Sequence, residues 1–489
     1  MNSRRKTVPS LLCLMLAVLL LAAPLAGGAA GVVLDRDAQG GYAGDYVLIL
    51  NPHFPDGRRL STGFLNGLID TDVPAFELLG GAEPEEEDAP LPLPDPYAAS
   101  LPAEDGYDFA QGDAWQEGFV RAFHLEVGPS GSASRTPVAM RVQYVGQYGR
   151  VWTAVNPAYT PLDESTAREI GQWFDSMCPQ AAHLFGKASD PRGDQRINLL
   201  FYDIGMPSVS GLTSPFDLCP PDDAPWPSDR LPMLHIDTRG PQQQLSFSSR
   251  PSALERIQYV VVHELQHLLY NAHVLGLPSS LSRDQVSRLL WTDPSHIWMT
   301  EFLSAAAGRM LLQDIASAMI LPQWYHPLAS QDDVEAFFLD HRDFLVYPHY
   351  PAQLGQSLFK WWGTRDSYAI MGLLADFALR RGDEQIFLQT RQRWEERQDN
   401  TAPEHPVQAL AAAMGYERFS DFLEDFVLFM VISDHGQPAP VRPAITVGRE
   451  VKMEAGSFLV IKPLKKVYTP PITAMDGLVY IGITLANSQ

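Results

Sequence analysis

The feature that most constrains the fold is an apolar helical segment that carries two histidines four residues apart. Ser252 and Glu255 form a capping-box pattern, which predicts that a helix begins at Ala253. Four residues are just over one helical turn, so the spacing places His263 and His267 on one face, where both imidazoles reach one cation. A chain with this helix is expected to fold around a buried metal site.

The residue types around this pair indicate zinc and hydrolysis. Two neutral imidazole nitrogens and one acid form a donor set that suits Zn2+. Glu264 follows the first histidine, where its carboxylate reaches a metal-bound water without being a ligand itself. Because zinc lowers the pKa of such a water towards about 7, the pattern predicts a hydrolytic centre with Glu264 as general base.

Tetrahedral zinc needs a third protein ligand, and the sequence offers two candidates. Glu301 lies in a second predicted helix that opens near residues 293–295. His273 lies ten residues after His263, at the spacing of a pattern that requires glycine where this chain has Tyr270. A bulky aromatic disfavours the positive φ of that turn. We therefore expect Glu301 to be the ligand and His273 to lie at the helix end beside solvent.

Several segments together resemble one group of enzymes. The zinc-type helix, the later helix with Trp298 three residues before Glu301, and the strand-like run over residues 197–205 are similar to those of the gluzincin clan of zinc metallopeptidases. Within that clan the chain is most similar to the secreted hyicolysin-type family. The resemblance covers roughly residues 140 to 370.

The resemblance implies a site and a fold. It implies Zn2+ bound by His263, His267 and Glu301, with Glu264 as general base in the hydrolysis of peptide bonds. It also implies an α+β class, in which a gluzincin-like catalytic domain has a sheet-containing upper half and a helical lower half around a cleft. The expected partner is therefore a protein or peptide substrate.

A donor for the developing oxyanion is expected to face the metal. Tyr347, His349 and Tyr350 lie together in one segment before a predicted helix. Relatives place a tyrosine at a similar position, and on this resemblance we assign the catalytic role to Tyr350.

Two positions depart from the pattern of these enzymes. They commonly have glycine after the glutamate ligand and an acid four residues after it, where this chain has Phe302 and Ala305. The acid orients a zinc histidine, and loss of such a partner weakens metal affinity or activity by about 10–100-fold. The leading hypothesis is thus a secreted zinc endopeptidase. The alternative is a catalytically weakened, peptidase-like secreted binding or adhesion protein.

The order of sequence patterns along the chain predicts four parts. Residues 1–31 have the basic, apolar and small-residue regions of a signal peptide, which predicts export. A β-rich domain is expected over 32–156, with an acidic, proline-rich linker near 82–96. The catalytic domain is expected over 157–440, and a small β appendage over 441–489.

The net charge and the cysteine content limit which partners the protein can have and which cellular compartment it occupies. The formal net charge of −22 argues against nucleic acid and anionic membrane surfaces as partners. No stretch after the signal peptide is long and apolar enough to span a bilayer. Export would allow Cys178 and Cys219 to form a disulfide, since Cys13 leaves with the signal peptide.

Overall fold

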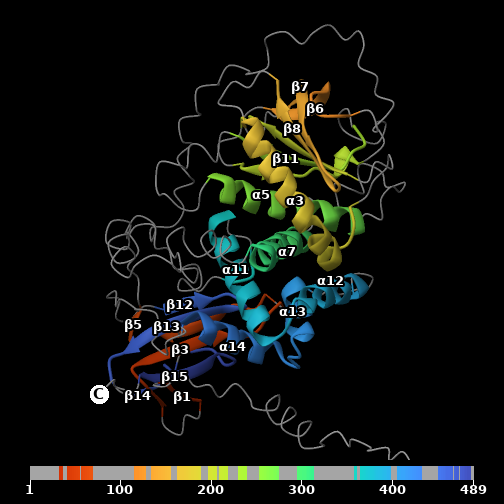
Figure 1. Cartoon of the computed structure of the whole chain (residues 1–489). Coiled ribbons are helices and arrows are strands. Elements are labelled where there is room, and N and C mark those ends of the chain that lie inside the picture. Colours follow the sequence, from red (N-terminus) through yellow and green to blue (C-terminus); the bar gives the residue numbers. More distant parts are fainter. Residues whose placement is uncertain are drawn as a thin grey trace, which may run out of the picture. The chain divides into compact units, whose positions relative to one another are not determined.

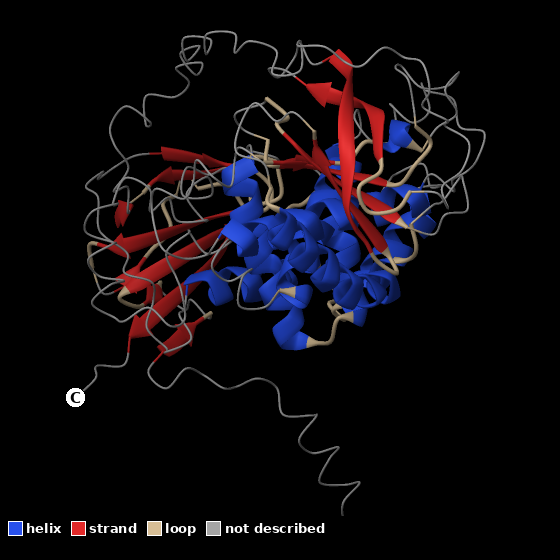
Figure 2. Ribbon diagram, turned by 45° about the horizontal axis from the view of Figure 1, so that its top comes forward, coloured by secondary structure: helices blue, strands red, loops and turns tan. Residues whose placement is uncertain are grey.

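The structure, a computed structural model, contains both helices and sheets, which agrees with the predicted α+β class (Figures 1 and 2). Contacts divide the chain into two units. Unit 1 comprises Met1–Asp72, Tyr350–Ser357 and Ser420–Gln489, and unit 2 comprises Val73–His349 and Leu358–Phe419. The structure describes residues 32–36, 41–55, 57–65, 67–69, 115–127, 134–155, 162–188, 196–205, 209–218, 229–238, 253–274, 294–312, 357–360, 364–397, 405–431, 450–465, 467–472 and 474–485.

Unit 1 contains a five-stranded sheet to which early and late parts of the chain both contribute. The strand order is β1-β15-β3-β13-β5, and all neighbouring strands are antiparallel. Two smaller pairs, β12 with β4 and β14 with β2, also combine a late strand with an early one. The strands are β1 (Val32–Asp35), β2 (Tyr42–Ala43), β3 (Tyr46–Asn51), β4 (Leu60–Phe64), β5 (Gly67–Ile69), β12 (Glu450–Met453), β13 (Ser457–Pro463), β14 (Val467–Tyr468) and β15 (Val479–Leu485).

The sheet of unit 1 is buried on both faces. Val47 and Ile49 of β3 lie in one apolar cluster with residues of β13, while Leu48 and Leu50, which alternate with them, are also buried. The helix α14 (Phe419–Val431) belongs to this unit apart from its first residue. A continuous apolar run in β3 is therefore the expected pattern of a strand covered on two sides.

The predicted domain boundaries differ from those of the structure. The sequence suggested one β-rich domain over 32–156 and a separate appendage over 441–489. In the structure the early strands pair with the late strands in unit 1, whereas the strands between 120 and 154 belong to the sheet of unit 2. Strand patterns identify strands but carry no signal for their partners. The predicted linker near 82–96 lies outside the described residues.

Unit 2 contains a six-stranded mixed sheet in the order β10-β11-β9-β8-β7-β6. The central strands β11, β9 and β8 are parallel to one another, and β10, β7 and β6 are each antiparallel to their neighbours. β10 and β6 therefore form the two edges. The strands are β6 (Val120–Val127), β7 (Ser134–Val145), β8 (Gly149–Ala154), β9 (Ile197–Tyr202), β10 (Gly211–Leu212) and β11 (Met233–Asp237).

The helix α3 (Glu164–Phe185) connects the parallel strands β8 and β9 and packs on the sheet. Its N-cap is Asp163, whose side chain accepts a hydrogen bond from the backbone of Thr166 at 2.9 Å. Gly149 permits the close packing, because a Cβ there would lie 2.7 Å from Phe174 Cδ1. α3 thus covers one face of the sheet.

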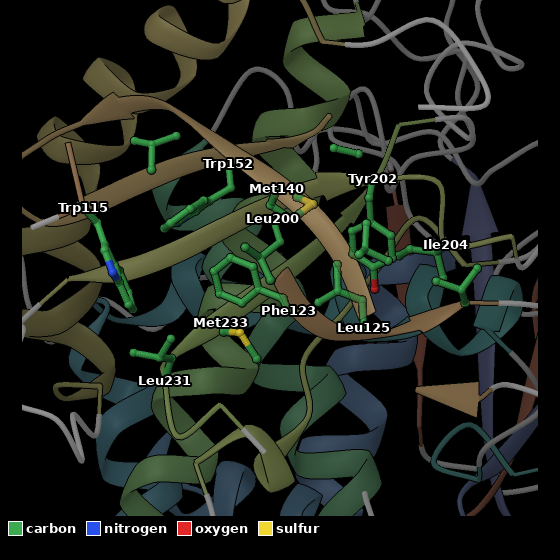
Figure 3. Packing of buried hydrophobic residues seen from close by; sticks show 14 residues of the cluster. Trp115, Phe123, Leu125, Met140, Trp152, Leu200, Tyr202, Ile204, Leu231 and Met233 are labelled. Atoms are coloured by element: carbon green, nitrogen blue, oxygen red, sulfur yellow. The ribbon is translucent and has the colours of Figure 1, made fainter. Parts of the chain in front are cut away.

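The opposite face of the sheet carries an apolar core cluster of unit 2 (Figure 3). Trp152 of β8 makes edge-to-face contacts with Trp115 and Phe123, with ring centroids 5.6 and 4.8 Å apart. Trp152 Nε1 donates to Asn198 Oδ1 at 3.0 Å, so its polar group is satisfied within the core. The other labelled members are Leu125, Met140, Leu200, Tyr202, Ile204, Leu231 and Met233.

The helical part of unit 2 begins with α5, which packs against β10 and β11. α7 packs against both α5 and α11, and an ion pair of 2.7 Å between Arg309 and Asp376 joins α7 to α11. In the part of the chain that is described, no helix has the length and apolar character needed to cross a bilayer. The helices are α5 (Ala253–Val274), α7 (Pro294–Leu311), α11 (Thr364–Arg381), α12 (Gln385–Arg397) and α13 (Pro406–Ala413).

Two further predictions differ from the structure. Pro232 lacks an amide donor, which favours a position near a sheet edge for the apolar run over residues 231–236. β11 instead lies between β10 and β9. Pro232 precedes the strand, and its carbonyl accepts from the backbone of Asn198, so its missing N–H costs the sheet nothing. Cys178 is a free cysteine on the buried face of α3, where burial raises its pKa to about 12. This contradicts the predicted disulfide with Cys219, which lies outside the described residues.

Candidate metal centre

The predicted metal-binding helix is α5, and it holds both histidines on one face. α5 begins at Ala253, as predicted, and runs to Val274. The side chains of His263 and His267 are each 14% exposed, and their Nε2 atoms lie 3.0 Å apart. Apolar residues on the remaining faces are buried and fix the helix in the unit: Val261, Val262, Leu265, Leu268 and Leu269.

The neighbouring helix α7 brings a carboxylate to the two imidazoles. Glu301 Oε2 lies 3.4 Å from His263 Nε2 and 3.5 Å from His267 Nε2. Within the described residues these three form the one group of at least three His, Cys, Asp or Glu whose ligand atoms lie within 4.8 Å of one another. The structure thus brings together the three residues that the sequence analysis proposed as ligands.

The distances among these atoms fit a tetrahedral ion. Ligands bound to zinc at about 2.0–2.1 Å are separated from each other by roughly 3.3 Å when the geometry is tetrahedral. The observed separations are 3.0, 3.4 and 3.5 Å. Two nitrogens and one oxygen are also a donor set that zinc prefers. The three residues could therefore hold zinc with little rearrangement.

The charge balance of the group favours an ionised carboxylate. Burial alone would raise the pKa of Glu301, but His267 and His263 beside it hold that pKa well below its usual range through their charge and hydrogen bonds. An ionised Glu301 is the form that binds a metal.

Glu264, the predicted general base, is buried next to the metal-binding group. Its side chain lies on α5 directly after His263, and only 5% of the residue is exposed. Burial raises the pKa of Glu264 to about 7, while nearby His263 acts to lower it and Glu301 to raise it further. A carboxylate with a pKa near neutrality is suited to both accept and return a proton.

The edge strand β10 closes over Glu264. A Cβ at Gly211 would lie 2.6 Å from Val260 Cγ1, 2.9 Å from Glu264 Cγ and 3.1 Å from Glu264 Oε1. Only glycine leaves room for this approach. The Thr213 hydroxyl donates to the backbone carbonyl of Glu264 at 3.1 Å, which ties the segment after β10 to α5. No residue pattern in the sequence predicts this contact with the base.

Two hydroxyl groups of α7 also lie at the site, and the sequence analysis assigned them no role. Thr300 Oγ1 lies 2.7 Å from His267 Nδ1. Ser304 Oγ donates to the backbone carbonyl of Glu301 at 2.8 Å and lies 3.5 Å from His263 Nε2. The signal that could have found them is their spacing from Glu301, at one residue before and three residues after, which places them on or beside its helix face.

His273 does not have the setting of a third ligand. α5 continues through Tyr270 to Val274, so the chain makes no turn that would bring the residue back towards His263. Tyr270 is buried, and its hydroxyl lies 3.2 Å from His296 Nδ1. The assignment of the third ligand to Glu301, and not to His273, stays a prediction.

The two positions that depart from the resemblance are filled by apolar packing. Phe302 is fully buried and stacks on Trp298 with ring centroids 5.2 Å apart, and its ring lies 5.8 Å from that of Phe387 on α12. Ala305 is also buried. Neither side chain can orient a histidine. Tyr350, the predicted oxyanion donor, lies outside the described residues, as do Tyr347 and His349.

Comparison with known proteins gives one distant similarity. No protein-family model matches the chain. The chain is similar to the neutral metalloprotease ShpI of Staphylococcus hyicus, with 26% identity over 182 residues, which are 36% of this chain and 36% of the relative. The chain thus spans about a third of the length of that curated relative. The similarity supports a relationship to metalloproteases.

Proposed function

We propose that the chain is a secreted zinc endopeptidase of the gluzincin clan, similar to the hyicolysin-type family. The observation that carries the proposal is the convergence of His263, His267 and Glu301, whose ligand atoms lie 3.0 to 3.5 Å apart, with Glu264 buried beside them. The distant similarity to a metalloprotease supports the same class of reaction. Zinc is the proposed cofactor.

In the proposed mechanism, the metal acts as a Lewis acid and the protein transfers the protons. Zinc bound there would supply a Lewis acid that lowers the pKa of water and polarises a peptide carbonyl. Glu264 takes a proton from the attacking water and later gives it to the leaving amine. Its pKa of about 7 places both protonation states within reach near neutral pH. This role requires a carboxylate, since an amide neither takes up nor returns the proton.

The substrate is proposed to be an extended peptide that lies along β10. This strand is an edge of the unit 2 sheet, and Gly211 brings it within van der Waals contact of Glu264. Exposed sheet edges bind extended peptides through main-chain hydrogen bonds, which are largely independent of sequence. Such binding would place a peptide bond next to the base and the metal. We propose on this basis that cleavage occurs within a polypeptide and not only at its ends.

The proposal is tested by metal analysis of the purified protein together with digestion of denatured casein, with and without a chelator. Chelation should abolish cleavage, and added zinc should restore it. Glu264→Gln should retain zinc and fold but lose activity by about 10²–10⁴-fold, because the proton transfer is removed. Glu169→Gln changes an exposed glutamate of α3 and serves as the matched control, with activity like that of the parent.

Two outcomes would overturn the proposal. Cleavage by Glu264→Gln at the parent rate would remove the role of Glu264. Bound zinc without any turnover by the parent would favour the alternative function, a secreted binding or adhesion protein on a peptidase scaffold. Export itself is tested by N-terminal sequencing of the protein recovered from the medium, which should begin near residue 32.

A further inference from the structure

The outer nitrogen of His267 has a specific partner. His263 and His267 both direct Nε2 towards Glu301, so Nδ1 of each ring is the nitrogen left over. For His267 this Nδ1 lies 2.7 Å from Thr300 Oγ1, which is a short hydrogen bond. A neutral imidazole that offers the Nε2 lone pair to a metal carries its proton on Nδ1. Nδ1–H therefore donates and the Thr300 hydroxyl accepts.

We propose that Thr300 is a positioning residue of the zinc centre, which fixes both the tautomer and the ring orientation of His267. This inference rests on the proposed zinc function of the site. Partners of this kind orient histidine ligands and tune the metal, and their loss typically costs 10–100-fold in metal affinity. Ala305 cannot orient a histidine ligand, because its side chain has no polar group.

The geometry makes Thr300 suited to this role. It precedes Glu301 directly in α7, so one turn of helix supplies both a ligand and the partner of another ligand. Threonine is β-branched and has few χ1 rotamers in a helix, which limits the motion of its hydroxyl. α5 and α7 are therefore held in register at the metal by two contacts from adjacent residues.

A hydroxyl partner has a chemical consequence that a carboxylate would not have. A carboxylate on Nδ1 increases the electron density of the imidazole and adds a negative charge near the metal. Thr300 adds no charge, so the centre would have two neutral imidazoles and one carboxylate around a divalent ion. Zinc should then be bound less tightly but should polarise water and carbonyl groups more strongly than with a carboxylate partner.

The test measures zinc affinity by competition with a chromophoric chelator, on the full chain. Thr300→Val keeps the shape of the side chain but removes the hydroxyl, and zinc affinity should fall by about 10–100-fold. Thr300→Ser restores the hydroxyl and should bind zinc within a few-fold of the parent. Cobalt substituted for zinc should give an altered ligand-field spectrum in Thr300→Val only.

The matched control is Thr390→Val in α12. Thr390 is a helical threonine of the same unit and is fully buried, whereas Thr300 is half-buried; its hydroxyl donates to the backbone carbonyl of Ile386 at 2.7 Å, not to a histidine. Its replacement should leave zinc affinity unchanged, although it removes a hydroxyl from the same unit. A fall in affinity in both valine variants would indicate a general structural effect and would overturn the proposal.

The remaining outcomes separate this inference from the proposed function. Tight zinc binding by Thr300→Val, in an experiment where Glu301→Ala has lost zinc, would overturn the role of Thr300 and leave the zinc centre standing. Equal, weak zinc binding by the parent and by Glu301→Ala would overturn the zinc centre itself. Weaker binding by Thr300→Val with recovery in Thr300→Ser would support the positioning role.

Discussion

Histidines in unit 2 are held in two contrasting ways. His235 is fully buried, and both ring nitrogens have partners: Nδ1 lies 3.1 Å from the Tyr202 hydroxyl and Nε2 lies 2.8 Å from Asp217 Oδ2. His263 and His267 are less buried, and their Nε2 atoms face each other at 3.0 Å beside a single carboxylate oxygen. In the second arrangement, two imidazole nitrogens and one carboxylate oxygen direct their lone pairs at one point, where a cation could bind.

The difference shows how a structural histidine can be distinguished from a metal ligand. The hydrogen bonds of His235 link β11 to β9 and to the segment of Asp217, so this ring completes a network that needs no further atom. On α5 the Nε2 atoms of two neutral imidazoles and the carboxylate oxygen are all acceptors. A cation bound between them satisfies all three at once. Removing a residue should therefore affect stability at the first site and metal binding at the second.

The largest expected effect is that of Glu301→Ala. Zinc affinity should fall by more than the 10–100-fold that loss of an outer partner costs, because a direct anionic ligand is removed. His273→Ala is the matched control and should retain zinc and activity. Metal content after dialysis measures both variants, and zinc retained in Glu301→Ala but lost in His273→Ala would reverse the assignment.

Phe302→Ala tests whether the centre depends on packing or on its ligands. The variant should lower the free energy of unfolding by about 3–5 kcal/mol, because the fully buried ring leaves a cavity beside Trp298 and Phe387. Zinc bound per folded molecule should remain unchanged. Denaturant titration and chelator competition measure the two quantities, and an unchanged stability would show that the aromatic packing contributes little.

A comparison of His235→Phe with His263→Phe tests the difference between a structural histidine and a proposed metal ligand. The first should lower the unfolding free energy of the metal-free protein by about 3 kcal/mol, because the buried Asp217 carboxylate loses a partner. The second should change that stability little but should abolish tight zinc binding. Urea denaturation in the presence of a chelator gives the comparison. Equal losses of stability in the two variants would contradict it.

The smallest effect is expected from Gly211→Ala. The added Cβ would displace the Glu264 side chain or β10, since it would lie 2.9 Å from Glu264 Cγ and 2.6 Å from Val260 Cγ1. We expect kcat/KM for casein peptides to fall by roughly 10-fold, because small misplacement of a catalytic group is costly. Zinc affinity should be unchanged. An unaltered rate would show that β10 does not constrain the base.

The parts of this site that the sequence predicted are those set by local periodicity. The capping pattern marks the start of α5 at Ala253, and helical spacing alone places His263 and His267 together. Glu301 was identified by its residue type and because Tyr270 disfavours the turn that His273 would need, and the family resemblance implies the same ligand. The contacts of Thr300 and Gly211 depend instead on the rotation of α7 and on the approach of β10, which no local pattern encodes.

The same limit applies to the fold. The strand-like run over residues 197–205 correctly located β9, and strands were expected within 32–156 and 441–489, where β3, β6, β7, β13 and β15 lie. Alternation or continuous apolar character reports burial of a strand. Pairing between distant strands leaves no such trace, and the separate domains predicted over 32–156 and 441–489 failed for this reason. β8 was also missed as a separate strand, because its six buried residues include Arg150 and Thr153.

The pairing of β1 with β15 also affects how unit 1 is assembled in time. Val32 pairs with Leu485, so the two partners are about 450 residues apart in the chain. During synthesis β1, β3 and β5 exist long before β13 and β15, and the loop to be closed is among the longest that the chain offers. Unit 1 is therefore expected to form last. A cut in the chain between these strands, made before they pair, would turn an intramolecular step into a bimolecular encounter of two half-sheets.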